Sequence, residues 1–394
     1  MMNKLPMYND EDSITGSVCP LIHRRIFSSL VFSSWIPSLL VTYQLLGQEP
    51  VEDLEAGLER LRKRDKLPGL IAGHFTLSGE EELGVAGFRR AGTDLRLRVD
   101  DPMHLGSCTK SMTATLLGIL VDEEKIGFET TLGEVFHDDP KVTGSPWKDA
   151  TMRQLMSHTS GAVPNPPWNQ FAGPIEHAVS TRRNVLHWMV ERPKREESVG
   201  DFEYSNLGYT VLGHAIEKIR GHAWEEEIRL RLFEPLYMRS AGFGPPSKQI
   251  ADAPWGHNMV FGLPIATDTD NPPALGPAGT VHASMHDWIK YLRIHLMTDP
   301  AKECGLPLTA KTLEELHRPI EGTEYAGGWG CGERTWATGR VLTHNGSNTH
   351  WYCVVFLAPE QGRGVIAASN IGLSSAQACD EALQLMIRRH PIAG

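Results

Sequence analysis

A serine and a lysine stand three residues apart in the stretch HLGSCTKSMTATLLGIL, residues 104–120. In a helix, residues at i and i+3 lie on one face, so the Ser107 hydroxyl and the Lys110 amine can meet. A serine hydroxyl becomes a good nucleophile only when a neighbouring group takes its proton. Lysine can take it where burial or nearby positive charge lowers the pKa of its amine. The pair is therefore a candidate nucleophile and base, although a capping serine and a solvated lysine would show the same spacing.

Cys108 is a second possible nucleophile directly beside Ser107. Successive helix residues differ in direction by about 100°, so Cys108 points away from the Lys110 face. We expect Cys108 to be a core residue.

Two later motifs add groups of the kind that hydrolysis needs. The stretch EYSNLGYTVLG supplies Tyr204 and Asn206, and THNGSNTHW supplies His344, Gly346 and Ser347. Taken singly, Tyr204 could be a packed aromatic, Asn206 a helix cap and His344 an ordinary strand histidine. Taken in order, S-x-x-K, Y-x-N and H-x-G resemble the serine β-lactamase-like family, which contains class C β-lactamases, D-alanyl-D-alanine carboxypeptidases and β-lactamase-fold esterases. The stretches LMSHTSG and GPAGTVHASMHDWIKYL resemble further landmarks of that family.

The resemblance implies a role for each matching position. Ser107 would be the acylated nucleophile, and Lys110 would accept or relay its proton. Tyr204 would be the general base, as a phenolate held by Lys110. Asn206 would bridge Lys110 and the acyl side chain of the substrate. The backbone N–H groups of Ser107 and Ser347 would form the oxyanion hole.

The third motif departs from the usual K-T-G of relatives. His344 stands where many relatives have lysine, and would line the substrate pocket from an edge strand, with Gly346 leaving room for the substrate. Histidine has an ordinary pKa of about 6.5, so it is largely uncharged at neutral pH and gains charge towards pH 6. Asn345 replaces the usual small hydroxyl residue. We therefore expect esters to be preferred over β-lactams, whose carboxylate a lysine would bind.

The elements that must position these residues come from both ends of the chain. Leucines at helical spacing predict a helix after Pro50, and two strands follow over 69–92. Residues 325–370 alternate as three strands, and 374–390 form a closing helix. The stretch 127–273 is irregular and mostly helical. The fold class is α+β: an antiparallel sheet built from N- and C-terminal strands, flanked by helices, with an inserted mostly helical lobe.

The N-terminus has the pattern of an export signal. Arg24 and Arg25 precede an apolar run over 26–43, which is typical of a secretory signal or a single membrane anchor, and a buried core helix is the alternative. We expect residues 1–48 to direct export or anchoring, which places the hydrolase domain, 50–394, in the periplasm, outside the cell or on the outer side of a membrane.

Composition excludes several other functions. The net charge of −10 without basic clusters argues against a nucleic-acid partner. The six cysteines form no C-x-x-C pair, which disfavours a zinc ribbon or a thioredoxin-type motif. Cys331 and Cys353 could pair if they face each other on neighbouring strands, or all six could be free thiols. Neither H-E-x-x-H nor G-x-S-x-G is present, which disfavours a metalloprotease and an α/β-hydrolase.

These residues together predict a serine hydrolase that acts through an acyl-enzyme on an ester or amide. The resemblance implies no cofactor and no metal, and a small-molecule ester, amide or peptide as substrate, with membrane attachment possible through the N-terminal segment. The alternative is a penicillin-binding sensor or an inactive scaffold of the same fold, against which the intact Ser107, Lys110 and Tyr204 argue.

Overall fold

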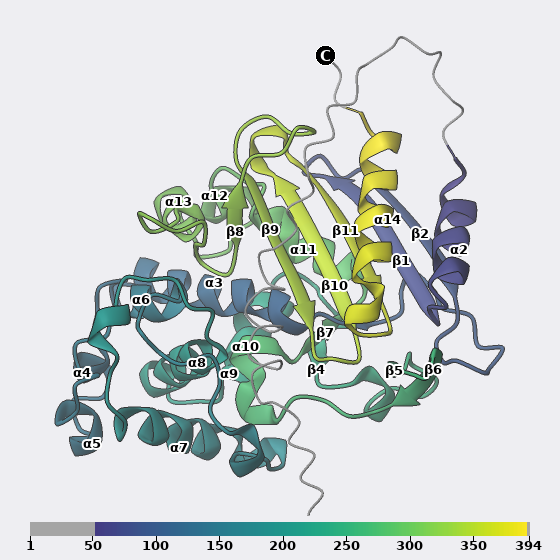
Figure 1. Cartoon of the computed structure of the whole chain (residues 1–394). Helices are drawn as coiled ribbons and strands as arrows, with labels where there is room; N and C mark the ends of the chain where they lie inside the picture. The colour runs from purple at the N-terminus through teal and green to yellow at the C-terminus, as the bar shows by residue number, and fades with distance from the viewer. Residues whose placement is uncertain (1–51, 392–394) are drawn as a thin grey trace, which may run out of the picture. The chain divides into compact units, whose positions relative to one another are not determined.

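The centre of the protein is a six-stranded antiparallel sheet in the order β2-β1-β11-β10-β9-β8 (Figure 1). The structure, a computed structural model, describes residues 52–391. In the middle of the sheet, β1 from the start of the chain pairs with β11 from its end, with Leu70 opposite Ser369. The expected α+β fold with a sheet built from both chain ends is confirmed. The strands are β1 (Gly69–Thr76), β2 (Glu81–Gly87), β8 (Gly330–Gly332), β9 (Val341–Ser347), β10 (Tyr352–Ala358) and β11 (Arg363–Ser369).

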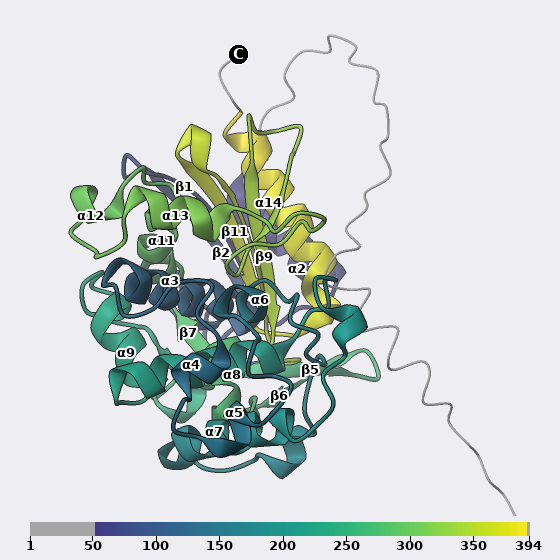
Figure 2. The ribbon, with the colours of Figure 1, turned by 90° about the vertical axis from the view of Figure 1, so that its left-hand side faces the viewer.

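Helices cover both faces of this sheet. Figure 2 shows α2 (Leu54–Arg64) and α14 (Ala376–Arg389) on one side, and α11 (Met285–Ile294) and α13 (Ala310–His317) on the other. Side chains alternate along each strand, so β1 sends Leu70 to the α2 and α14 side and Ile71 to the other. Two hydrophobic layers therefore fix the sheet, and through it the position of β9.

The final strands differ in number from the prediction. Residues 325–370 form four strands rather than three, because a short β8 pairs with β9 at the edge of the sheet. Glycines begin and end β8, so the alternation of apolar and polar residues that identifies a strand is missing there.

The inserted lobe is mostly helical, as its sequence predicts. Its helices are α4 (Leu132–Val135), α5 (Pro140–Thr143), α6 (Met152–Met156), α7 (Ala178–Val190), α8 (Asn206–Arg220) and α9 (Trp224–Ile228). The lobe also carries a hairpin that the sequence did not predict, formed by β5 (Gly256–Val260) and β6 (Leu263–Thr267). A separate three-stranded sheet has the order β3 (Met103–His104), β7 (Val281–Ala283) and β4 (Gly242–Phe243).

Helix α3 (Thr109–Asp122) follows β3 and carries Lys110. Every residue from Thr109 to Leu120 is buried, and the second half of this stretch, from Leu116 to Leu120, contains no polar side chain. The helix lies between the sheet and the lobe (Figure 1). This position places the start of α3, together with Ser107, where the two halves of the fold meet. Two short helices, α10 (Gly276–Gly279) and α12 (Pro300–Glu303), lie on either side of α11 in the sequence.

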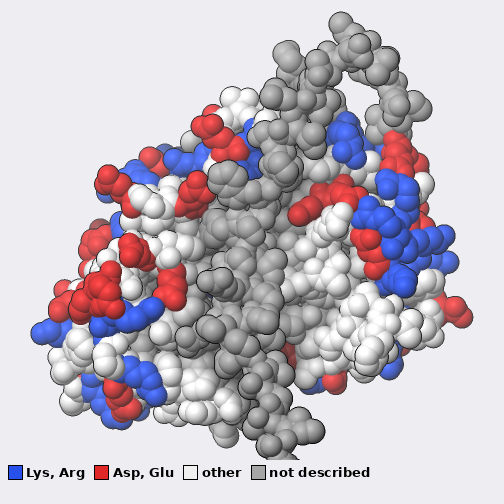
Figure 3. Space-filling view, in the orientation of Figure 1, with Lys and Arg blue, Asp and Glu red and all other residues white. Residues whose placement is uncertain are grey.

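Acidic and basic side chains are intermixed on the face shown in Figure 3. Over α2, for example, Arg60 pairs with Glu52 and Arg62 pairs with Glu59. Within residues 52–391, none of the helices combines the length and the apolar composition that a membrane span requires. The predicted export signal or anchor, residues 1–48, lies outside those residues.

Candidate active site

The structure brings the Ser107 and Lys110 side chains together, as their helical spacing predicts. Ser107 lies in the 3-10 turn η1 (Gly106–Cys108), and Lys110 lies in the first turn of α3. Lys110 Nζ is 3.1 Å from Ser107 Oγ. Ser107 is half-buried and reachable, whereas Lys110 is fully buried, so the amine can act on the hydroxyl but is not a solvated surface group.

Two further acceptors fix the Lys110 amine. Its Nζ donates to Asn206 Oδ1 at 2.8 Å and to the carbonyl oxygen of Ala278 at 2.7 Å. Burial lowers the pKa of Lys110 well below its ordinary value. Both oxygens can only accept hydrogen bonds, so a neutral amine gives them its two protons and turns its lone pair to Ser107 Oγ. In its neutral form, Lys110 can therefore accept the proton of Ser107.

The Tyr204 hydroxyl completes the group around the nucleophile. It hydrogen-bonds to Ser107, and its ring centre lies 4.7 Å from Lys110 Nζ. Burial raises the pKa of Tyr204 above its ordinary value. A raised pKa for the phenol and a lowered pKa for the amine both favour a neutral pair. In such a neutral pair the phenol can relay a proton, whereas the phenolate that the resemblance implies stays a prediction.

Two glycines let the turn η1, which carries Ser107, approach strand β9 closely. Gly106 has a left-handed φ of +49°, and a Cβ placed on it would lie 2.4 Å from Ser347 N. A Cβ on Gly346 would lie 2.8 Å from Ser107 N and 2.0 Å from the carbonyl oxygen of Leu105. The amides of Ser107 and Ser347 consequently lie at the contact between the two segments. Paired backbone N–H groups of this kind can stabilise an oxyanion.

His344 forms a neutral wall of the site. Its Nδ1 lies 2.5 Å from the carbonyl oxygen of Asn345, and its Nε2 lies 3.1 Å from the Tyr325 hydroxyl. Because a carbonyl only accepts, Nδ1 carries the proton and Nε2 accepts from Tyr325. Burial lowers the pKa of His344 to about 3. The expected gain of charge towards pH 6 is therefore wrong, and neither ring nitrogen is free for the substrate.

Asn206 connects the site to the loop over residues 165–171. Its Nδ2 donates to Asn165 Oδ1 at 2.9 Å, and the Trp168 indole donates to the same oxygen at 2.9 Å. Both belong to the NPPWNQF segment. Ser205, not Asn206, caps helix α8, so the Asn206 side chain is left for the site. This loop therefore borders the site on the side of Asn206.

Two aromatic residues, His158 and Tyr325, pack against the Tyr204 ring. His158, with a φ of +63°, accepts the N–H of Ser205 at 3.0 Å, and its ring centre lies 4.4 Å from that of Tyr204. The Tyr325 ring lies 4.6 Å from His158. His158 belongs to the stretch LMSHTSG, which the sequence identifies as a family landmark without giving any of its residues a role. Tyr325 follows no motif in the sequence and emerges only from the fold.

Cys108 faces the core, as its helical phase predicts. It is 1% exposed, and its Sγ lies 3.5 Å from Cys353 Sγ. Cys331 instead donates to the carbonyl oxygen of His317. The suggested bond between Cys331 and Cys353 is therefore not formed, and the five cysteines among the described residues are free thiols.

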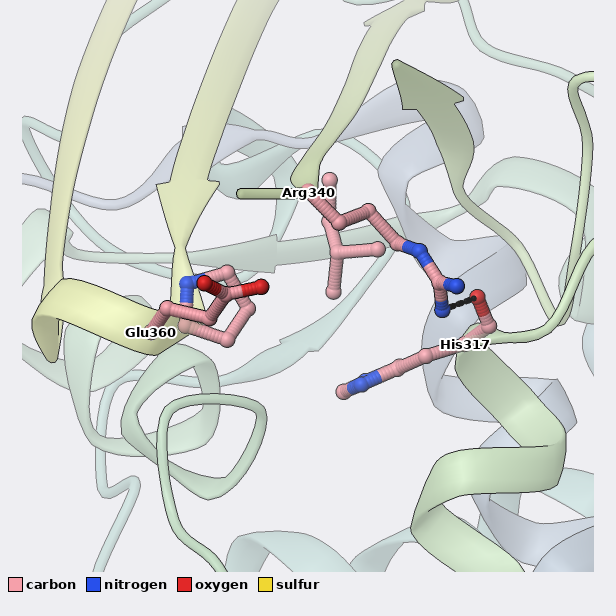
Figure 4. A pocket seen from close by; sticks show the side chains of 5 residues that line it. His317, Arg340 and Glu360 are labelled. Atoms are coloured by element: carbon pink, nitrogen blue, oxygen red, sulfur yellow. Dashed lines mark hydrogen bonds between the residues drawn. The ribbon is translucent and has the colours of Figure 1, made fainter. Parts of the chain in front are cut away.

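A cavity of about 250 Å³ opens near the far end of β9 (Figure 4). Arg340 there donates to the carbonyl oxygen of His317 at 2.7 Å. The lining residues are His317, Arg340, Leu342, Pro359 and Glu360. None of these belongs to the group around Ser107, so this cavity is separate from the candidate active site.

Known proteins resemble the chain in sequence and in fold. The "Penicillin-binding protein 4" of Amycolatopsis lactamdurans is 25% identical over 324 residues, which cover 79% of this chain and 82% of the relative. The "Unguisins hydrolase ungD'" of Aspergillus campestris is 24% identical over 297 residues, and this match covers 70% of the chain and only 54% of that relative. These relatives include hydrolases.

The fold also matches solved structures. The "Beta-Lactamase/D-Alanine Carboxypeptidase" of Pseudomonas syringae superposes with a TM-score of 0.70 at 15% identity, over 86% of this chain and 98% of that one. A family model described as Beta-lactamase matches residues 58–386 and so includes every site residue described above. The chain therefore belongs to the Beta-lactamase family.

Proposed function

We propose that the protein is a serine hydrolase that cleaves an ester or amide bond through an acyl-enzyme on Ser107. The observation that carries this proposal is the hydrogen bonding of Lys110. A buried amine with two acceptor-only partners presents its remaining lone pair 3.1 Å from a reachable hydroxyl. Such a pair activates serine for attack.

The groups of the site divide the reaction into two halves. Ser107 Oγ attacks the substrate carbonyl carbon, and its proton passes to Lys110. The carbonyl oxygen becomes an oxyanion between the N–H groups of Ser107 and Ser347. When the bond to the leaving group breaks, the leaving group takes that proton by way of the Tyr204 hydroxyl. Water then attacks the ester on Ser107, with the same groups handling its proton in reverse.

The neutral wall around His344 supports a preference for uncharged substrates. Penicillins and peptide C-termini carry a carboxylate near the bond that is cleaved, and a lysine at this position would offer it a permanent charge. His344 instead stays neutral because burial lowers its pKa to about 3. We expect short-chain p-nitrophenyl esters to be turned over more efficiently than a chromogenic cephalosporin near pH 7.5. Amides remain within the proposal, since relatives carry the names of a penicillin-binding protein and an unguisins hydrolase.

Intact-mass analysis tests the proposed function directly. The wild type and Ser107→Ala are each exposed to p-nitrophenyl acetate and to benzylpenicillin. A serine hydrolase gains the acetyl mass and loses it within the assay, and the alanine variant gains nothing. An adduct that persists with penicillin would instead identify a penicillin-binding sensor, and no adduct with either reagent would identify an inactive scaffold.

Export or anchoring is a second part of the proposal. It is supported by Arg24 and Arg25 before the apolar run over 26–43. Fractionation of cells that produce the full chain or a chain without residues 1–48 tests it. Equal distribution of the two chains between compartments would refute an export role.

A further inference from the structure

A single carboxylate joins the two segments that carry the oxyanion-hole amides. Asp270 lies between β6 and the 3-10 turn η7 (Pro273–Leu275), and its side chain is 7% exposed. Its Oδ2 lies 3.1 Å from His104 Nε2, and its Oδ1 accepts from Asn348 Nδ2 at 2.6 Å. His104 precedes Ser107 by three residues, and Asn348 directly follows Ser347.

The hydrogen bonds fix the direction of each contact. His104 Nδ1 accepts the N–H of Gly106 at 3.1 Å, so the imidazole proton is on Nε2 and points to Asp270. The carboxylate thus holds the tautomer that anchors the amide directly before Ser107. On the other arm, Asn348 Oδ1 accepts the N–H groups of His350 and Trp351, each at 3.1 Å, so its Nδ2 must face Asp270.

Only an acceptor with two free oxygens satisfies this arrangement. His104 Nε2 and Asn348 Nδ2 are both donors, and a carboxylate accepts both. An asparagine at 270 would place its own NH₂ against one of them. A buried carboxylate is costly unless hydrogen bonds compensate it, and His104 and Asn348 supply them here.

We propose that Asp270 is a positioning residue that holds the Ser107 and Ser347 amides in register for the oxyanion. This inference rests on the proposed function. Asp270 touches neither the substrate nor Ser107, and acts through His104 on one side and Asn348 on the other. Without the Asp270 carboxylate, the turn η1 and the end of β9 can move apart.

The test compares Asp270→Asn with Asp268→Asn, a matched change two residues earlier on a side chain that is 51% exposed. A misplacement of about 1 Å can cost about 100-fold in rate, so kcat for a p-nitrophenyl ester should fall about 100-fold in Asp270→Asn, with KM within about threefold. Asp268→Asn should match the wild type. Phenylboronic acid, whose boron becomes a tetrahedral anion on Ser107 Oγ, should lose affinity by the same factor as kcat/KM. A purely structural defect would lower the melting temperature without this proportionality.

A second variant keeps the test decisive if Asp270→Asn does not fold. His104→Phe removes only the arm next to Ser107 and leaves Asp270 bonded to Asn348, so it should lower kcat with unchanged KM. Wild-type activity that needs Ser107, combined with an Asp270→Asn rate within threefold of wild type, would overturn the positioning role alone. Wild-type activity that survives Ser107→Ala would overturn the proposed function itself, and this role with it.

Discussion

Replacing Gly346 with alanine should separate the oxyanion-hole amides without removing any catalytic side chain. The new Cβ would lie 2.0 Å from the carbonyl oxygen of Leu105, 2.8 Å from Ser107 N and 3.0 Å from Cys108 N. Non-bonded carbon and oxygen atoms approach to about 3.3 Å, so η1 and β9 must move apart by about 1.3 Å. All three neighbours are backbone atoms, so no side chain can rotate away to relieve the contact.

Such a movement is comparable to losing one oxyanion-hole donor, which costs about 10²–10³ in kcat, or roughly 2.7–4 kcal/mol. We therefore expect kcat/KM of Gly346→Ala for p-nitrophenyl acetate to fall by that factor. Gly332→Ala is the control, since that glycine ends the neighbouring strand β8 and its Cβ would meet only the tip of Arg334 at 3.3 Å. The rates come from stopped-flow or plate assays, with circular dichroism to verify folding. Full activity in a folded Gly346→Ala protein would refute the placement of the oxyanion hole.

Three further predictions concern side chains of the site. Ser107→Ala should abolish acylation in intact-mass analysis, whereas Cys108→Ser should retain most activity because its Sγ faces Cys353 in the core; the reverse outcome would move the nucleophile to Cys108. Tyr204→Phe and Lys110→Met should each lower kcat by about 10²–10⁴-fold. In the double variant, the fold loss in kcat should be far smaller than the product of the two single losses, because both groups handle one proton. Losses that multiply would show separate roles. The ratio of kcat/KM for the ester to kcat/KM for a cephalosporin should stay constant from pH 7.5 to 6, since burial lowers the pKa of His344 to about 3. A ratio that falls as the pH is lowered would reveal a charged imidazole.

The sequence predicted those features that depend on spacing along the chain. Ser107 and Lys110 meet because residues three apart in a helix share a face, and Cys108 turns to the core for the same reason. The closing helix expected over 374–390 is found as α14, Ala376–Arg389. Local periodicity was sufficient in each case, because the contact lies within one element.

Contacts between distant segments could not be predicted in this way. Tyr325 reaches His344 from outside any motif, and Asn165 reaches Asn206 from a proline-rich loop without periodicity. The expected gain of charge on His344 towards pH 6 was also wrong, because the pKa of His344 depends on burial by other elements. The hairpin of β5 and β6 was missed because its apolar and polar residues do not alternate. Val260, Leu263 and Ile265 are exposed, as is Phe261 in the turn, which is the opposite of the usual strand pattern.

The pairing of β1 with β11 has a consequence for biosynthesis. Translation at about 5–20 residues per second leaves β1 waiting roughly 15–60 s before its neighbour in the centre of the sheet leaves the ribosome. Until then, one edge of the β1–β2 hairpin is unpaired, and β9 and β10 have no strand to connect them to the start of the chain. Long-range pairing of this kind also slows folding itself. A chain that ends before Arg363 lacks β11 altogether, so a stop codon anywhere before that residue should yield an inactive, aggregation-prone product.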